Sequence, residues 1–352
     1  MFEVMNYTPF PHLLYQKYGK QAALFNVLAF RQTFRLKTGG HYSDLNNTQF
    51  PLVMADDYYH TSEDSSLIDE TDLVLGRPCT NIHIHGVAKP KDGIPTEQWR
   101  AGIRVKDFSR TWTLTGPSYW QYEKDNWQLT APLLTDGVSL RHEMAYGGRW
   151  INTQGETDAY AANPVGIGFY PDISALDKSK RYPAPQIIED TITTPREHHV
   201  INEEQLTLGS GPVSRWWMGR LEYAGTYDKH WEETRFPFYP DDFDEQFFNS
   251  APVHLRYPGF LAGNEPILLE GLLPESSTVV TALPNYQYLV LLQDIEGELF
   301  PVTPLLDTLT IDLDNRFISV VRRVRIPAEY PIKQAVISVV VPSQTKGACH
   351  VG

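Results

Sequence analysis

The sequence predicts an all-β protein built mainly from antiparallel strands. Two observations support this prediction. The 26 prolines and 24 glycines are spread over the 352 residues, and few windows long enough for a helix avoid both. What recurs instead is short alternation of apolar and polar residues, bounded by turn-forming residues. Such a pattern is typical of half-buried strands in a sandwich or barrel.

The first part of the chain contains four predicted strands. Residues 22–36 are rich in Phe, Leu, Val and Thr, which favour extended backbone. Residues 82–87 alternate apolar and polar side chains with the period of a strand. Residues 102–106 and 109–115 indicate two strands joined by Asp107 and Phe108, which predicts a hairpin.

The last part of the chain repeats this strand pattern, and helices are predicted to be few and short. One helical piece is expected over residues 227–234. The further predicted strands are residues 266–273, 278–282, 287–293, 305–313, 317–326 and 335–341. They are separated by Gly, Pro, Asn and Asp residues that favour turns.

The length predicts two domains, and the sequence indicates two related halves. We expect an N-terminal β domain over residues 1–146, an irregular Gly- and Pro-rich segment over residues 147–212 packed on the body, and a C-terminal β domain over residues 213–352. Short matches recur at an offset of 185, since 241 − 56 and 267 − 82 both equal 185. The matched positions are Asp56-Asp57-Tyr58 with Asp241-Asp242-Phe243, and Ile82, Ile84 and Gly86 with Ile267, Leu269 and Gly271. A duplicated β-sandwich or barrel-like unit explains them.

Charge and composition exclude several classes of function. The formal net charge of −13 repels phosphate backbones and anionic lipid, so neither a nucleic-acid nor a membrane partner is expected. Two cysteines, Cys79 and Cys349, cannot form a disulfide framework. No apolar run approaches the length of about 18 residues that a membrane span needs, and the N-terminus does not look like a signal peptide. We therefore expect a cytoplasmic protein.

Two histidines give the strongest argument for chemistry. His83 and His85 are two apart in a predicted strand, so both side chains leave the same face. A third ligand from Asp56, Asp57 or His142 would complete a metal site. The alternative function is therefore a metal-dependent or carbohydrate-active enzyme that uses His83 and His85. Complete ligand, nucleophile and phosphate-loop motifs are missing, so we predict no catalytic residue, no cofactor and no metal.

A dense group of aromatic residues is the most unusual feature of the chain. It runs from Trp216 to Phe248 and is interleaved with Arg and Asp residues. Aromatic side chains with arginine are typical of protein-interface hot spots. The same composition also suits a buried core edge held by arginine–carboxylate pairs. A carbohydrate-binding β module is a third interpretation, which exposed coplanar rings along a groove would support.

The same region resembles a bacterial family known as a domain of unknown function and encoded beside type VI secretion spike genes. The resemblance is carried by motifs in a fixed order, from about residue 22 to about residue 283 and more loosely beyond. The main motifs are Glu143-Met-Ala-Tyr-Gly-Gly148, Asn163-Pro-Val-Gly-Ile-Gly-Phe169, Gly211-Pro-Val-Ser-Arg-Trp216, Ala224-Gly-Thr-Tyr-Asp228, Arg235-Phe-Pro237, Pro240-Asp-Asp-Phe-Asp244 and Phe247-Phe-Asn-Ser-Ala-Pro252.

The resemblance implies a non-enzymatic cytoplasmic adaptor or chaperone. Such proteins bind a type VI effector and help to load it onto the VgrG spike, often through a PAAR domain. The expected partner is therefore a protein: an effector, a PAAR protein or VgrG. The residues expected to bind this partner, or to form the structural signature, are Trp216, Tyr227, Asp228, Trp231, Arg235, Asp241, Asp242, Phe243, Phe248 and Asn249.

Overall fold

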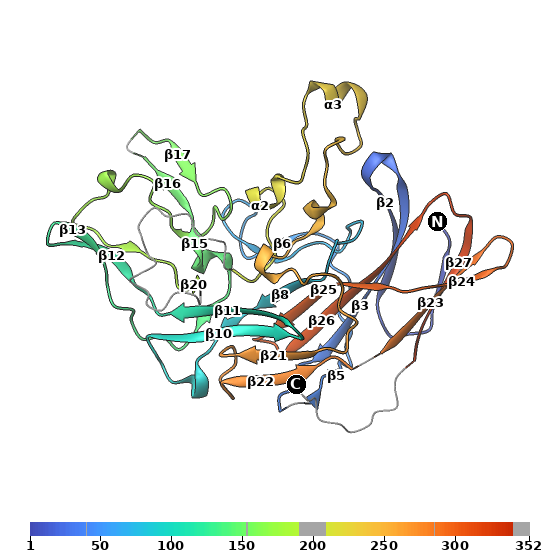
Figure 1. Cartoon of the computed structure of the whole chain (residues 1–352), viewed down its shortest axis with the longest axis horizontal. Coiled ribbons are helices and arrows are strands. Elements are labelled where there is room, and N and C mark those ends of the chain that lie inside the picture. Colours follow the sequence, from blue (N-terminus) through green and yellow to red (C-terminus); the bar gives the residue numbers. More distant parts are fainter. Residues whose placement is uncertain (40, 153, 190–208, 285, 341–352) are drawn as a thin grey trace.

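The computed structural model describes residues 1–39, 41–152, 154–189, 209–284 and 286–340. It confirms an all-β architecture of mainly antiparallel sheets (Figure 1). The α-helices of these residues are short: α2 (Met218–Leu221) and α3 (Lys229–Thr234). None of the helices in the described ranges has the length and apolar character needed to cross a lipid bilayer.

Three larger sheets form the body. The central sheet is β2 (His12–Tyr18), β3 (Leu24–Arg35), β26 (Phe317–Pro327), β25 (Leu305–Asp312) and β8 (Asn81–His85), with β5 (Asp44–Leu45) beside β3. The facing sheet is β20 (Ile187–Glu189), β11 (Phe108–Thr115), β10 (Gln98–Val105), β21 (Pro266–Glu270), β22 (Thr278–Ala282) and β4 (His41–Tyr42). The four-stranded sheet is β1 (Glu3–Asn6), β27 (Ile332–Val340), β23 (Gln287–Asp294) and β24 (Leu299–Val302).

Smaller sheets of two or three strands complete the described part. They are β6 (Asp57–Tyr58) with β7 (Leu67–Asp69), β9 (Val87–Ala88) with β14 (Val138–Ser139), β12 (Tyr119–Glu123) with β13 (Asn126–Leu129) and β19 (Tyr182–Pro183), β15 (Tyr146–Gly147) with β18 (Ile167–Gly168), and β16 (Arg149–Ile151) with β17 (Thr157–Ala159). The predicted strands therefore lie close to observed ones, and the predicted helix over 227–234 overlaps α3.

One apolar face of the central sheet packs on both other sheets. Near β8 and β25 it meets the facing sheet, where Ile82, Ile311 and Ile103 belong to the largest core cluster. Farther along the long strands β3 and β26 it meets the four-stranded sheet, through residues such as Phe30 and Val290. These two contacts, both sheet on sheet, exclude water from most of the large aliphatic side chains.

Strands from both predicted halves share these sheets. β8 lies at one edge of the central sheet, parallel to β25, whereas β21 lies inside the facing sheet between two antiparallel neighbours. Ile82 and Ile84 of β8 nevertheless enter the same core cluster as Ile267 and Leu269 of β21. The predicted halves on either side of residues 147–212 thus contribute strands to the same sheets. That the two halves arose by duplication stays a prediction.

The described part of the 147–212 segment joins the body through short strands. β20 pairs with β11 of the facing sheet, and β18 and β19 pair with β15 and β12. A small aromatic cluster that includes Tyr170 and Trp120 packs beneath this segment. Residues 190–208 lie outside the described residues.

The opposite face of the central sheet carries polar and charged side chains. Along β8, Ile82 and Ile84 point into the core, so Asn81, His83 and His85 point the other way. We call the residues that cover this face, 46–77 and 209–250, the covering layer. Its contacts with the sheet are hydrogen bonds and ion pairs as well as apolar packing, and the candidate site lies in and above it.

Candidate functional site

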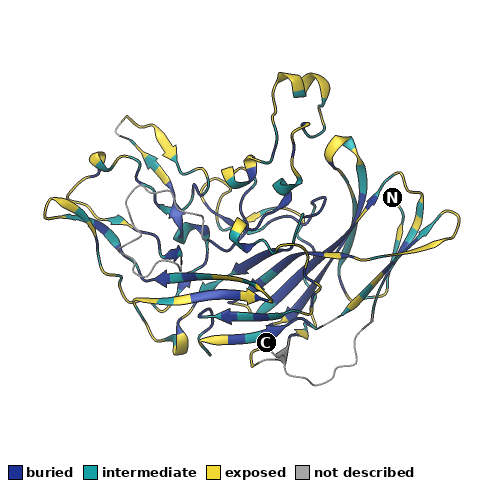
Figure 2. Ribbon diagram, in the orientation of Figure 1, coloured by how far each residue is buried: buried dark blue, intermediate teal, exposed yellow. Residues whose placement is uncertain are grey.

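A segment of the covering layer extends away from the sheets. Residues 222–242, here called the projection, carry α3 at its tip (Figure 1). The tip is coloured as exposed in Figure 2, and two of its aromatic side chains are largely exposed. Tyr227 is 53% exposed and Phe236 is 66% exposed, and both contact the half-buried ring of Trp231, at centroid distances of 4.7 and 5.6 Å.

Polar contacts fix the shape of the projection. The side chain of Asp228 caps α3 by accepting a hydrogen bond from the Trp231 amide at 2.9 Å. The Trp231 indole donates to the Phe238 carbonyl at 2.8 Å, and Arg235 forms an ion pair with Asp241 at 3.1 Å. These contacts hold the rings in place although little of the projection is covered by other elements.

The two ends of the projection meet through Asp242. Its carboxylate accepts hydrogen bonds from the amide and hydroxyl of Thr226, at 2.9 and 2.7 Å. These hydrogen bonds lower the pKa of the Asp242 carboxyl. Gly225 lies beside this carboxylate with a φ of +81°, and a Cβ there would come within 2.8 Å of the Asp242 oxygen. A glycine is therefore required at this close approach.

The base of the projection is buried in the covering layer. Phe243 and Phe248 are 0% and 5% exposed and pack with Val27 of β3. The Asn249 side chain is buried and accepts a hydrogen bond from Asn81 of β8 at 2.8 Å. Phe243, Phe248 and Asn249 thus hold the layer on the sheet, whereas Tyr227 is exposed.

A buried ionic cluster joins α2 to the central part of the molecule. Glu70 lies 2.8 Å from Arg77, 3.0 Å from Arg215 and 2.7 Å from Arg220, and both Glu70 and Arg220 are fully buried side chains. Arg220 also donates to the carbonyls of Val213 and Phe247. We call Glu70, Arg77, Arg215 and Arg220 the ionic cluster. It ties the base of the projection to the residue that follows β7.

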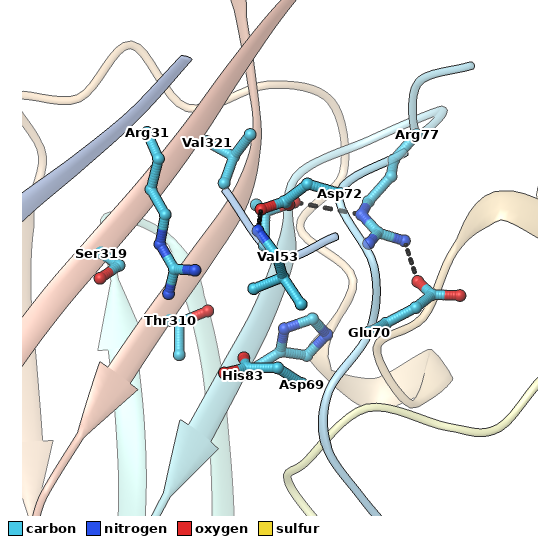
Figure 3. A pocket seen from close by; sticks show the side chains of 11 residues that line it. Arg31, Val53, Asp69, Glu70, Asp72, Arg77, His83, Thr310, Ser319 and Val321 are labelled. Carbon is cyan, nitrogen blue, oxygen red and sulfur yellow. Dashed lines mark hydrogen bonds and ion pairs between the residues drawn. The ribbon is translucent and has the colours of Figure 1, made fainter. Parts of the chain in front are cut away.

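The ionic cluster keeps Glu70 ionised. Burial by itself raises the pKa of the Glu70 carboxyl, but the guanidinium groups of Arg220, Arg77 and Arg215 hold this pKa well below its ordinary range. A second buried ionic group of three residues lies next to it, where Arg323 contacts Asp307 and, at 3.2 Å, Asp72. Figure 3 shows Arg77 beside Glu70 at the edge of a small cavity above the central sheet.

The predicted histidine pair is placed side by side, with ring centroids 6.3 Å apart. His83 is 3% exposed, and its Nε2 atom lies 3.1 Å from the Ser250 hydroxyl. Burial holds the pKa of His83 well below its ordinary value. Over the described ranges, no group of three His, Cys, Asp or Glu side chains is arranged to hold a metal ion. Asp56, Asp57 and His142 therefore do not complete a ligand set with this pair.

Acid is expected to destabilise the fold through its buried histidines. Burial lowers the pKa of His254 to about 3, from an ordinary value of 6.5. Between these values the unfolded chain takes up a proton that the folded chain does not, so stability falls as the pH falls. Between about pH 6.5 and pH 5.5 we expect His254 to remove about 1 kcal/mol of unfolding free energy. Urea unfolding of the wild type and of His254→Gln should show a weaker pH dependence in the variant. Equal pH dependence would contradict this assignment.

Comparison with known proteins identifies the family to which the chain belongs. Residues 22–323 match the family described as "Uncharacterized protein conserved in bacteria (DUF2169)". The chain belongs to this family. The match includes the projection, the ionic cluster and β8, so the candidate site lies wholly inside the part that defines the family. No curated protein and no solved structure matches the chain.

Sequence reasoning about this family member missed the ionic cluster. Glu70 is 145 positions from Arg215 and 150 positions from Arg220, so no local spacing connects them. The only signal was general: charged residues interleaved with aromatic ones around Trp216, compatible with arginine–carboxylate pairs at a core edge. Glu70 itself stands in a polar stretch with no motif around it.

Proposed function

We propose that this protein is a non-enzymatic adaptor that binds a type VI secretion effector and helps to load it onto the VgrG/PAAR spike. The projection is the contact element in this proposal. The observation that carries it is the exposure of Tyr227 and Phe236 on a segment whose base is buried and ion-paired. Exposed aromatic rings held in place lose little conformational entropy on binding, which favours a protein interface.

The surface around these rings suggests the chemistry of the partner. Apolar side chains continue from the projection onto α2, where Met218 and Leu221 are exposed, and Trp216 precedes them at 39% exposed. Exposed patches of this kind mark interaction sites. The projection holds six acidic residues against two basic ones, Lys229 and Arg235, and the chain has a net charge of −13. We therefore propose that the partner offers an apolar groove with basic residues at its rim.

The resemblance of the sequence motifs to spike-associated bacterial proteins is the reason for naming an effector as the partner. The motif Ala224-Gly-Thr-Tyr-Asp228 builds the start of the projection, and Pro240-Asp-Asp-Phe-Asp244 builds its end. The motifs of the resemblance are thus the residues that shape and anchor the proposed contact element. In this proposal the protein acts in the cytoplasm and is not exported with its cargo.

Co-expression tests the proposal directly. The protein should be produced together with a type VI effector from the same bacterium and analysed on a sizing column in low salt. We expect one complex whose mass is that of the two chains together. Separate elution of the two folded proteins would contradict the proposal. Produced without this protein, the same effector should be less soluble or fail to associate with its spike.

A further inference from the structure

A cavity of about 300 Å³ lies on the polar face of the central sheet, near the ends of β8 and β25. Its inner wall contains Arg31 of β3 and Ser319 of β26, which are both buried. Asp314 and Asn315, in the turn between β25 and β26, are exposed and mark its mouth. The volume is at the lower end of the range of small-molecule sites. None of these residues belongs to the projection.

Two polar atoms in the wall lack a hydrogen-bond partner, although the Arg31 guanidinium donates through another nitrogen to the Pro51 carbonyl at 3.3 Å. The Nε atom of Arg31 and the Nε2 atom of His85 are buried and make no hydrogen bond with any described residue. Arg31 is only 8% exposed, and its guanidinium lies beside Thr310 and Ser319 (Figure 3). A buried donor without an acceptor costs about 1–3 kcal/mol, so such groups are rare unless something else satisfies them. A ligand in the cavity would do so.

The wall carries one guanidinium, that of Arg31, and three carboxylates, those of Asp69, Asp312 and Asp314, so its formal charge is negative. The Asp312 carboxylate accepts hydrogen bonds from the backbone and side-chain amides of Asn315, both at 2.8 Å, and Asp314 accepts one from the Val87 amide at 3.1 Å. Asp69 is left opposite Arg31, and the two interact electrostatically. Burial raises the pKa of the Asp69 carboxyl, which His85 and Arg31 partly oppose. The negative formal charge disfavours an anionic ligand, and the buried guanidinium of Arg31 disfavours a cation against the inner wall.

The rest of the wall includes three aromatic side chains, together with Ile68 and Thr310. Phe50 and Phe317 meet edge to face at 5.0 Å, and Tyr59 lies on the other side with Arg141 stacked on its ring at 4.4 Å. Such a wall accepts the C–H faces of a ligand, while Arg31, His85 and Asp69 supply both donors and acceptors. Hydroxyl groups donate and accept together, so they match this set better than a carboxylate or an ammonium group.

We propose that this cavity binds a neutral sugar, a mono- or disaccharide, through Arg31, His85 and Asp69. The ring hydroxyls would pair with these three side chains, and the apolar ring face would lie against Phe50 and Phe317. The inference is about binding and involves no reaction. It also stands apart from the adaptor proposal, because the cavity and the projection share no residue.

Calorimetric titration tests the sugar site. Glucose, galactose, N-acetylglucosamine and maltose are titrated into the wild-type protein, with citrate and arginine as charged probes. We expect at least one sugar to bind and neither charged probe to do so. Asp69→Asn and His85→Gln should each lower the affinity for that sugar by 10-fold or more. Asp136 is an exposed carboxylate outside the cavity, so Asp136→Asn should change the affinity for that sugar less than 2-fold.

Three results would overturn the assignment: no sugar binds the wild type, both cavity variants bind it unchanged, or citrate or arginine binds in its place. Thermal unfolding of each variant without ligand separates loss of binding from loss of fold. If Asp69→Asn unfolds at a lower temperature than the wild type, the test rests on the sugar affinity of His85→Gln alone. That replacement keeps a hydrogen-bonding side chain in the cavity.

Discussion

Replacing Glu70 by alanine is expected to lower the free energy of unfolding by about 3–5 kcal/mol. The substitution removes the only carboxylate within 3.0 Å of the guanidinium groups of Arg77, Arg215 and Arg220 among the described residues. Arg77 and Arg220 have almost no exposed side-chain surface, so water cannot replace the lost partner without opening the covering layer. Three like charges would also repel each other at short range.

Urea unfolding followed by tryptophan fluorescence measures this effect. Glu329→Ala, at an exposed position, is the matched control and should stay within about 0.5 kcal/mol of the wild type. The pKa of Glu70 is held below its ordinary value of 4.5, so its contribution is complete above that pH and is lost only as the pH falls toward the folded value. A Glu70→Ala variant as stable as the control would show that the cluster does not anchor the layer.

Replacing Tyr227 and Phe236 together by alanine is expected to weaken effector binding by about 100-fold, which corresponds to about 2.7 kcal/mol. Both rings are more than half exposed, so their removal costs the free protein little. In a complex the same rings would be buried against the partner, and the variant loses that burial. The melting temperature should therefore remain close to that of the wild type.

The matched control replaces two apolar side chains of equal exposure on another part of the surface. Ile295 and Leu299, in the β23–β24 hairpin, are 68% and 58% exposed. Ile295→Ala with Leu299→Ala should leave effector binding unchanged, as measured by surface plasmon resonance on the purified proteins. If the two double variants weaken binding equally, or neither does, the projection is not the contact element.

The strands were the most predictable part of this protein. Residues 109–115 and 317–326 alternate or run apolar over the length of a strand and end at turn residues, and they lie in β11 and β26. Such strands can be predicted because the alternation of side chains depends only on neighbouring residues, and each face of a sheet is either buried or exposed. The pairing of β8 with β25 was not predictable, because parallel neighbours are joined by long connections that carry no local signal.

In the aromatic region, the sequence did not predict which rings are buried and which are exposed. Trp216 and Trp217 are adjacent in the chain, yet Trp216 is 39% exposed and Trp217 is 0% exposed. Phe236 lies on the projection, while Phe243 is buried under Tyr239, with ring centroids 4.0 Å apart. Composition could indicate a core or an interface, and the structure contains both buried and exposed rings. Which ring is buried and which is exposed depends on the path of the backbone between them.

The amino-acid sequence by itself determined the all-β class, most strand positions and the unusual character of the region after Trp216, because these depend on neighbours within a few residues. Only the tertiary structure decided that Glu70 meets Arg220 and that Arg31 and His85 line one cavity. Those contacts join residues from separate strands and loops. Their strength comes from exclusion of water by the whole covering layer, which no single segment can provide.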